Sequence, residues 1–121
     1  MCGDAPNFTE TPRGSLDLRF HTIRLDGYLD IARYPEFRAA FECVPADLPV
    51  LIDISAATGV DSVFLSELLL LKRRHGLPVA IVMPADPRVA RIFAIAGIGE
   101  KLGVFERSEE ARSALSSTAA G

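Results

Sequence analysis

The chain has 121 residues, a formal net charge of −3, 24% charged residues and 49% hydrophobic residues. This length fits one domain, and the composition is typical of a globular protein rather than a disordered one. The acidic balance argues against nucleic-acid binding, which needs a concentrated basic surface. No apolar run approaches the roughly 20 residues that span a bilayer. We therefore expect neither nucleic acid nor membrane as a partner.

The cysteines and the N-terminal residues indicate the compartment. Cys2 and Cys43 are far apart and lack metal-type spacing. Residues 1–14 contain neither the basic start nor the apolar run of a signal peptide, and they are expected to form a flexible arm. We expect a cytoplasmic protein with reduced thiols, and no metal or cofactor.

The first half of the folded part begins with a strand. Apolar and polar residues alternate from Leu16, and the alternation slips by one near Thr22, which indicates a turn or bulge there. A helix is expected to begin at Tyr34-Pro35 and to end at Pro45.

The centre of the chain predicts a strand, a loop and a helix. Val50–Ile54 is continuously apolar up to Asp53, as in a strand that is covered on both faces. A loop of small residues follows, and a leucine-rich helix runs from the pair Asp61-Ser62 to His75. Gly76 ends this helix.

The last third continues the alternation of strands and helices. Residues 78–84 are an apolar strand, and Asp86 and Pro87 open a helix that stops at Gly97. A short strand over 102–106 precedes a final helix from Ser108, and 117–121 is expected to be a disordered tail. This order predicts an α/β domain over 15–116, with a mostly parallel sheet of four or five strands and about four helices.

The central helix has a polar strip beside its apolar face. At 100° per residue, Phe64, Leu68 and Leu71 should face the sheet. The opposite side carries Ser62, Ser66 and Arg73, with Leu69 and Leu70 beside them. Either these two leucines form part of a docking surface, or another helix covers them.

Ser62 stands where loop turns into helix, and two interpretations of it are open. Its hydroxyl can cap the helix. It can also accept a phosphoryl group, because the helix N-terminus favours negative charge. Catalysis is not expected, since the sequence has no GxxxxGK[ST], GxGxxG or GxSxG motif and only two histidines.

Three segments resemble the motifs of one known family. LDGYLD (25–30) looks like the family's L-x-G-E-L-D strand, and LIDISAATGVDS (51–62) is similar to its strand, loop and D-S-[ST]-G helix start. Residues 84–115 look like its C-terminal third, from a proline to a Glu-Glu-Ala run. The chain thus resembles the STAS domain of bacterial anti-sigma factor antagonists over roughly residues 18–115, and this resemblance implies the STAS fold.

The resemblance also implies a function. Family members bind an anti-sigma factor that is a serine kinase of the histidine-kinase-like ATPase fold, and phosphorylation releases this partner; a PP2C-type phosphatase reverses the change. The phosphoacceptor corresponds to Ser62, and Asp30 corresponds to the acidic residue near the kinase-binding surface. The partner-binding surface is expected to comprise Asp30, Asp61, Ser62, Ser66, Leu69, Leu70 and Arg73, on a monomer or weak dimer.

Three residues depart from the family's pattern. Val63 and Phe64 replace its second Ser/Thr and its Gly, and Tyr28 replaces its Glu. An outward phenylalanine would obstruct the approach of a kinase. The alternatives are a constitutive scaffold of the stressosome type, or a STAS subunit associated with a transporter or with small-molecule sensing.

Overall fold

The computed structural model describes residues 9–10, 20–97 and 102–120, with side chains for 20–97 and 102–115. In chain order the elements are β1 (Thr9–Glu10), β2 (His21–Leu29), the 3-10 helix η2 (Ile31–Arg33), α1 (Tyr34–Glu42), β3 (Val50–Val60), α2 (Ser62–Arg74), β4 (Val79–Val82), α3 (Pro87–Ile95), β5 (Gly103–Phe105) and α4 (Ser108–Ala120).

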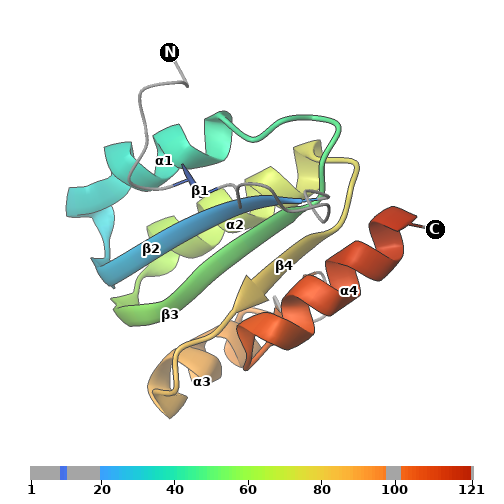
Figure 1. Cartoon of the computed structure of the whole chain (residues 1–121). Coiled ribbons are helices and arrows are strands. Elements are labelled where there is room, and N and C mark those ends of the chain that lie inside the picture. The colour runs from blue at the N-terminus through green and yellow to red at the C-terminus, as the bar shows by residue number, and fades with distance from the viewer. Residues whose placement is uncertain (1–8, 11–19, 98–101, 121) are drawn as a thin grey trace.

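The strands form one sheet in the order β1-β2-β3-β4-β5 (Figure 1). β1 pairs with β2 antiparallel, and the four strands from β2 to β5 are parallel. The expected α/β fold with a mostly parallel sheet is therefore confirmed. Each parallel step needs a crossover, which α1, α2 and α3 supply in turn.

The helices cover the sheet on both faces. The larger core cluster joins one face of the sheet to α1, α2 and α3, whose buried members are Phe37, Ala40, Phe41, Phe64, Leu65, Leu68, Leu71, Val89 and Phe93. A smaller cluster on the other face packs Ala111 and Leu115 of α4 against Leu51 and Val82. Figure 1 shows α4 crossing the sheet on the side opposite to α1 and α2.

β3 is longer than the sequence predicts. The expected loop after Ile54 is wrong, because Ser55 to Val60 continue the strand. Their partners are in the second half of β2, where Tyr28 lies opposite Gly59. A Cβ on Gly59 would lie 2.8 Å from the Tyr28 ring, so a small residue is needed beneath the tyrosine. The extension brings the end of β3 beside the end of β2.

The irregularity in β2 is displaced from its expected place. Pairing with β3 is regular from His21 to Arg24, so a bulge at Thr22 is excluded, and the alternating segment expected from Leu16 to Arg19 lies outside the described residues. The register shifts instead between Arg24 and Asp26 and again between Gly27 and Tyr28. Both shifts fall within LDGYLD, next to the candidate site.

The ends of α3 agree with the sequence prediction, whereas the predicted C-terminal domain limit does not coincide with the end of a helix. Asp86 caps α3 by accepting a hydrogen bond from the Arg88 backbone N–H (2.9 Å), and Gly97 adopts φ +71 after its end, as expected. The domain limit expected at 116 falls within α4, and the limit expected at 14 lies outside the described residues.

The expectation of a reduced Cys43 is wrong, because this residue is disulfide-bonded in the structure. Cys2 lies outside the described residues.

The buried His21 makes stability depend on pH. Burial, and to a lesser extent His75, lower the pKa of His21, so the folded state disfavours its protonation. His75 places its Nε2 2.6 Å from the Leu48 carbonyl oxygen. Below the unfolded pKa of about 6.5 the unfolded chain binds the extra proton, so stability is lost as the pH falls.

We predict that the free energy of unfolding falls by up to about 1.4 kcal/mol per pH unit below pH 6.5, down to the folded pKa of His21. Urea denaturation at pH 5.0, 6.0 and 7.5, followed by circular dichroism, measures this slope. The His21→Gln variant should lose most of it. A wild-type slope that persists unchanged in His21→Gln would assign the effect to other groups.

Candidate functional site

The junction between β3 and α2 is held by one carboxylate. Asp61 follows β3, and its backbone N–H donates to the Leu29 carbonyl oxygen at the end of β2 (3.2 Å). Its Oδ1 accepts hydrogen bonds from the backbone N–H groups of Val63 (3.0 Å) and Phe64 (3.1 Å). Asp61 is thus the N-cap of α2, and the interpretation of Ser62 as the cap is wrong.

The same carboxylate also reaches the neighbouring loop. Its Oδ2 accepts a hydrogen bond from the backbone N–H of Ile31 (3.0 Å), at the start of η2. Asp30 caps η2 through the Ala32 backbone N–H (3.1 Å). The structure therefore brings Asp30 and Asp61 together through Ile31, from segments thirty residues apart. Both aspartates hold backbone in place, as side-chain caps do.

Ser62 is the first residue of α2 and its side chain is exposed. Among the residues that the structure describes, none forms a hydrogen bond with its hydroxyl. Ser66 is exposed one turn later, and Arg73 is exposed in the last turn. The expected polar side of the helix is confirmed, but a rise of 1.5 Å per residue places Arg73 about 16 Å along the axis from Ser62.

Phe64 points into the core, as the helical spacing predicts. It is fully buried, and its ring lies edge-on to Phe37 with centroids 5.2 Å apart and near Phe41 at 6.0 Å. Val63 is partly buried against the same cluster. The two residues that follow the serine therefore anchor the start of α2 and leave the outer side of Ser62 open.

Apolar side chains lie exposed on α2 and on the segment next to its start. Leu70 of α2 is 47% exposed, whereas Leu69 is partly buried against the core. Covering by another helix is thus excluded for Leu70 within the described residues. Two further exposed residues come from the neighbouring segment: Tyr28, 54% exposed, and Ile31, 65% exposed. The alternation in β2 could have indicated Tyr28, but an isolated isoleucine after the strand gave no signal.

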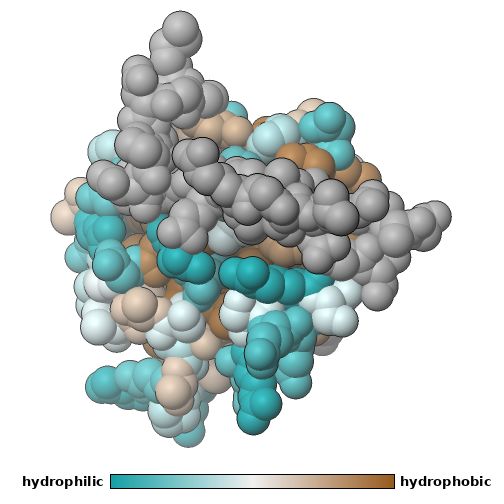
Figure 2. Space-filling model, viewed as in Figure 1, coloured by the Kyte–Doolittle hydropathy of each residue, from teal (hydrophilic) through white to brown (hydrophobic). Residues whose placement is uncertain are grey.

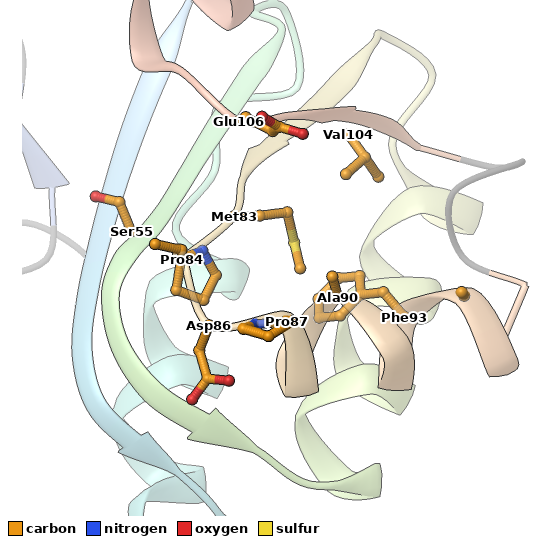
Figure 3. Close-up of a pocket in the computed structure, with 11 residues that line it drawn as sticks. Ser55, Met83, Pro84, Asp86, Pro87, Ala90, Phe93, Val104 and Glu106 are labelled. Carbon is orange, nitrogen blue, oxygen red and sulfur yellow. The ribbon is translucent and has the colours of Figure 1, made fainter.

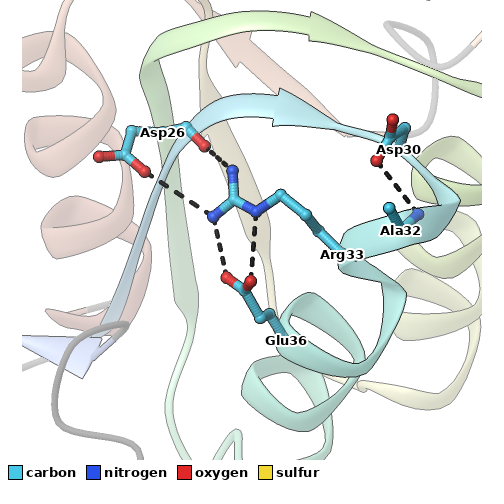
Figure 4. Close-up of polar contacts among 5 residues, drawn as sticks. All are labelled: Asp26, Asp30, Ala32, Arg33 and Glu36. Carbon is cyan, nitrogen blue, oxygen red and sulfur yellow. Dashed lines mark hydrogen bonds and ion pairs between the residues drawn. The ribbon is translucent and has the colours of Figure 1, made fainter.

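The segment that carries Asp30 and Ile31 is fixed by Arg33 (Figure 4). The Arg33 guanidinium forms two hydrogen bonds with Glu36, at 2.9 and 3.3 Å, and donates to the Asp26 carbonyl oxygen on β2. The hydrogen bond to Glu36 raises the pKa of Arg33 and lowers that of Glu36, so both groups stay charged. This contact holds the turn after β2 against the strand itself.

Gly27 is required beside this guanidinium. It adopts φ +74, and a Cβ there would lie 2.8 Å from Arg33 Nη1. We predict that Gly27→Ala lowers the free energy of unfolding by about 1–2 kcal/mol, because alanine is strained at positive φ. Urea denaturation measures the loss. Gly76→Ala is the matched control, since nothing lies within 4 Å of a Cβ at Gly76; an equal effect in both variants would contradict the account.

The part of the chain that the structure describes contains neither a candidate metal site nor a candidate membrane-spanning helix. No three side chains of His, Cys, Asp or Glu gather there into a group that could hold a metal ion. No described helix has the length and apolarity to cross a membrane.

Comparison with known proteins gives consistent matches. The family model of the STAS domain matches residues 16–111. A putative anti-sigma factor antagonist from Thermotoga maritima matches with a TM-score of 0.73 and 15% identity, over 89% of this chain and 93% of that one. An anti-sigma factor antagonist from Mycobacterium paratuberculosis matches with a TM-score of 0.71 and 20% identity, over 88% and 90%.

The unphosphorylated form of the anti-sigma factor antagonist SpoIIAA also matches, with a TM-score of 0.53 and 16% identity, over 84% of this chain and 91% of that one. No curated protein matches the sequence closely. At these identities the structural likeness shows the fold alone.

Proposed function

Since the chain belongs to the STAS domain family, we propose that it is an anti-sigma factor antagonist, a non-catalytic module that binds an anti-sigma factor and releases it when Ser62 is phosphorylated. The observation that carries this proposal is the exposed Ser62 side chain at the start of α2. The proposal places the chain in the cytoplasm.

The different roles of Asp61 and Ser62 support Ser62 as the phosphorylation site. Asp61 alone satisfies the N–H groups of Val63 and Phe64. The Ser62 hydroxyl is therefore not needed for the cap, and a kinase can modify it without unfolding the helix. The inward Phe64 removes the obstruction that an outward aromatic ring would present.

A phosphoryl group at Ser62 would change the surface more than the fold. It adds nearly two negative charges at neutral pH, which the N-terminal end of the helix dipole tolerates. Ile31, whose backbone N–H donates to the carboxylate of Asp61, the residue before Ser62, has an exposed apolar side chain, and Tyr28 is exposed three residues before Ile31. A partner that buries these side chains would have to desolvate the dianion, at a cost of several kcal/mol. Phosphorylation thus opposes the complex.

The proposed partner is an anti-sigma factor with serine kinase activity and a histidine-kinase-like ATPase fold. A PP2C-type phosphatase would restore binding. The proposed contact surface comprises Asp30, Asp61, Ser62, Ser66, Leu69, Leu70 and Arg73. In this surface Asp30 and Asp61 shape the backbone, Leu70 supplies exposed apolar area, and the partly buried Leu69 supplies less.

Phosphorylation is tested by intact-mass measurement after incubation with the cognate kinase and ATP. We expect the mass of one phosphoryl group to be added to the wild type and to Ser66→Ala, and nothing to be added to Ser62→Ala. Ser66→Ala is the matched control, because Ser66 is the next exposed serine on the same helix. An unmodified wild type in the presence of a kinase that binds it would contradict the switch and favour a constitutive scaffold.

A further inference from the structure

A concave site separate from the proposed partner surface lies between α3 and the ends of β4 and β5 (Figure 3). Its volume is about 740 Å³, within the range of about 300–1,000 Å³ typical of small-molecule pockets. None of the residues of the proposed partner surface lines it. Its described lining includes Met83, Asp86, Ala90, Phe93, Val104 and Glu106.

The cavity is built on rigid elements. It lies at the carboxyl ends of the parallel strands β4 and β5. The Met83 backbone N–H donates to the Phe105 carbonyl oxygen (2.8 Å), which fixes one wall against the next. Pro84 and Pro87 restrict the backbone of the segment between β4 and α3. A site held in this way loses little entropy when it binds a ligand.

Most of the lining is apolar. Figure 3 shows the side chains of Met83 and Val104 directed into the space that Ala90 and Phe93 of α3 bound on the other side. Val104 is 38% exposed, and Ile95, next to the lining residue Ala94, is 79% exposed. Figure 2 shows hydrophobic and protruding hydrophilic side chains together at the lower edge of the molecule, where α3 lies. Exposed aliphatic groups beside a cavity indicate an apolar ligand.

The charge of the described part of the lining is negative. Among the described residues, the ionisable ones that line the cavity are Asp86 and Glu106, and none of the described basic residues lines it. Asp86 is already paired with the Arg88 guanidinium, at 2.8 Å and 3.2 Å. The Glu106 carboxylate forms no hydrogen bond or ion pair with any residue that the structure describes, so its charge is available to a ligand.

We propose that this cavity binds a small amphipathic cation, with an apolar body of one or two rings against Met83, Phe93 and Val104 and an ammonium group at Glu106. Burying the ring body accounts for most of the affinity. The carboxylate selects the cation, because a charge-assisted hydrogen bond is stronger than a neutral one.

Tryptamine and its neutral analogue tryptophol serve as matched probes. Titration followed by two-dimensional NMR should give saturable shifts for tryptamine at the lining residues, with a Kd on the order of 1 mM for a ligand of this size. Tryptophol should bind about fivefold more weakly, because it lacks the charge. In Glu106→Gln the two probes should bind equally, and Ala90→Trp should abolish binding of both.

Circular dichroism checks the fold of Ala90→Trp, which alters an exposed helix position. Ser62→Ala should bind tryptamine as the wild type does. The proposal for this cavity and the proposal for phosphorylation at Ser62 can therefore be contradicted independently of each other. The proposal is overturned if tryptamine shows no saturable shift, if tryptophol binds as tightly as tryptamine, or if a folded Ala90→Trp binds unchanged.

Discussion

Replacing Phe64 with alanine should lower the free energy of unfolding by about 3–5 kcal/mol, the usual cost of removing a buried aromatic side chain. The ring is fully buried and contacts Phe37 and Phe41 of α1. Its loss leaves a cavity where the first turn of α2 meets α1. Urea denaturation followed by circular dichroism measures the change, since the chain contains no tryptophan.

Leu70→Ala is the matched control for Phe64→Ala. Leu70 lies on the same helix but is 47% exposed, so its truncation should cost less than about 1 kcal/mol. A loss below about 1 kcal/mol in Phe64→Ala would show that the ring does not anchor the helix. The departure from the glycine of the family's pattern would then have no packing explanation.

Asp61→Ala is expected to have the second largest effect, a loss of about 2–3 kcal/mol in the free energy of unfolding. The variant removes an N-cap, worth about 1 kcal/mol, and leaves a third backbone N–H, that of Ile31, without its charged acceptor. Chemical denaturation measures this loss. In Asp61→Asn the loss should be about half as large, because one oxygen can still accept from Val63 and Phe64.

Two variants separate this account from a simple capping effect. Asp86→Ala removes the cap of α3, which holds a single helix N–H, and should cost about 1 kcal/mol. Ser62→Ala should change stability by less than about 0.5 kcal/mol, because its hydroxyl is not the cap. A loss of about 1 kcal/mol or more in Ser62→Ala, with little effect in Asp61→Ala, would reverse the two roles.

Much of the fold could be predicted from the sequence, because the patterns that decide it are local. Proline and aspartate at helix starts, such as Pro87 after Asp86, place the caps correctly. The spacing of Phe64, Leu68 and Leu71 identifies the buried face of α2. The alternation of apolar strands with helices predicts the parallel sheet. A helix between two strands returns the chain to the same end of the sheet, so the next strand can pair parallel to the previous one.

The predicted and the observed structure differ where a distant segment decides the local structure. The small residues after Ile54 have weak strand propensity, yet they extend β3 because β2 pairs with them and Tyr28 covers Gly59. The sequence predicts Asp61 as part of the site, but the hydrogen bond of Asp61 with Ile31 depends on a loop thirty residues away. Exposure of Ile31 likewise follows from tertiary packing and from no pattern in the sequence.

In the proposed switch, Ser62 controls binding of an anti-sigma factor. Isothermal titration of that partner with the unphosphorylated and the Ser62-phosphorylated protein tests it most directly. We predict that phosphorylation weakens binding at least about a hundredfold, or about 2.7 kcal/mol, the scale expected for burying a dianion among apolar groups. Equal affinity of the two forms would contradict the switch and leave a constitutive binding module.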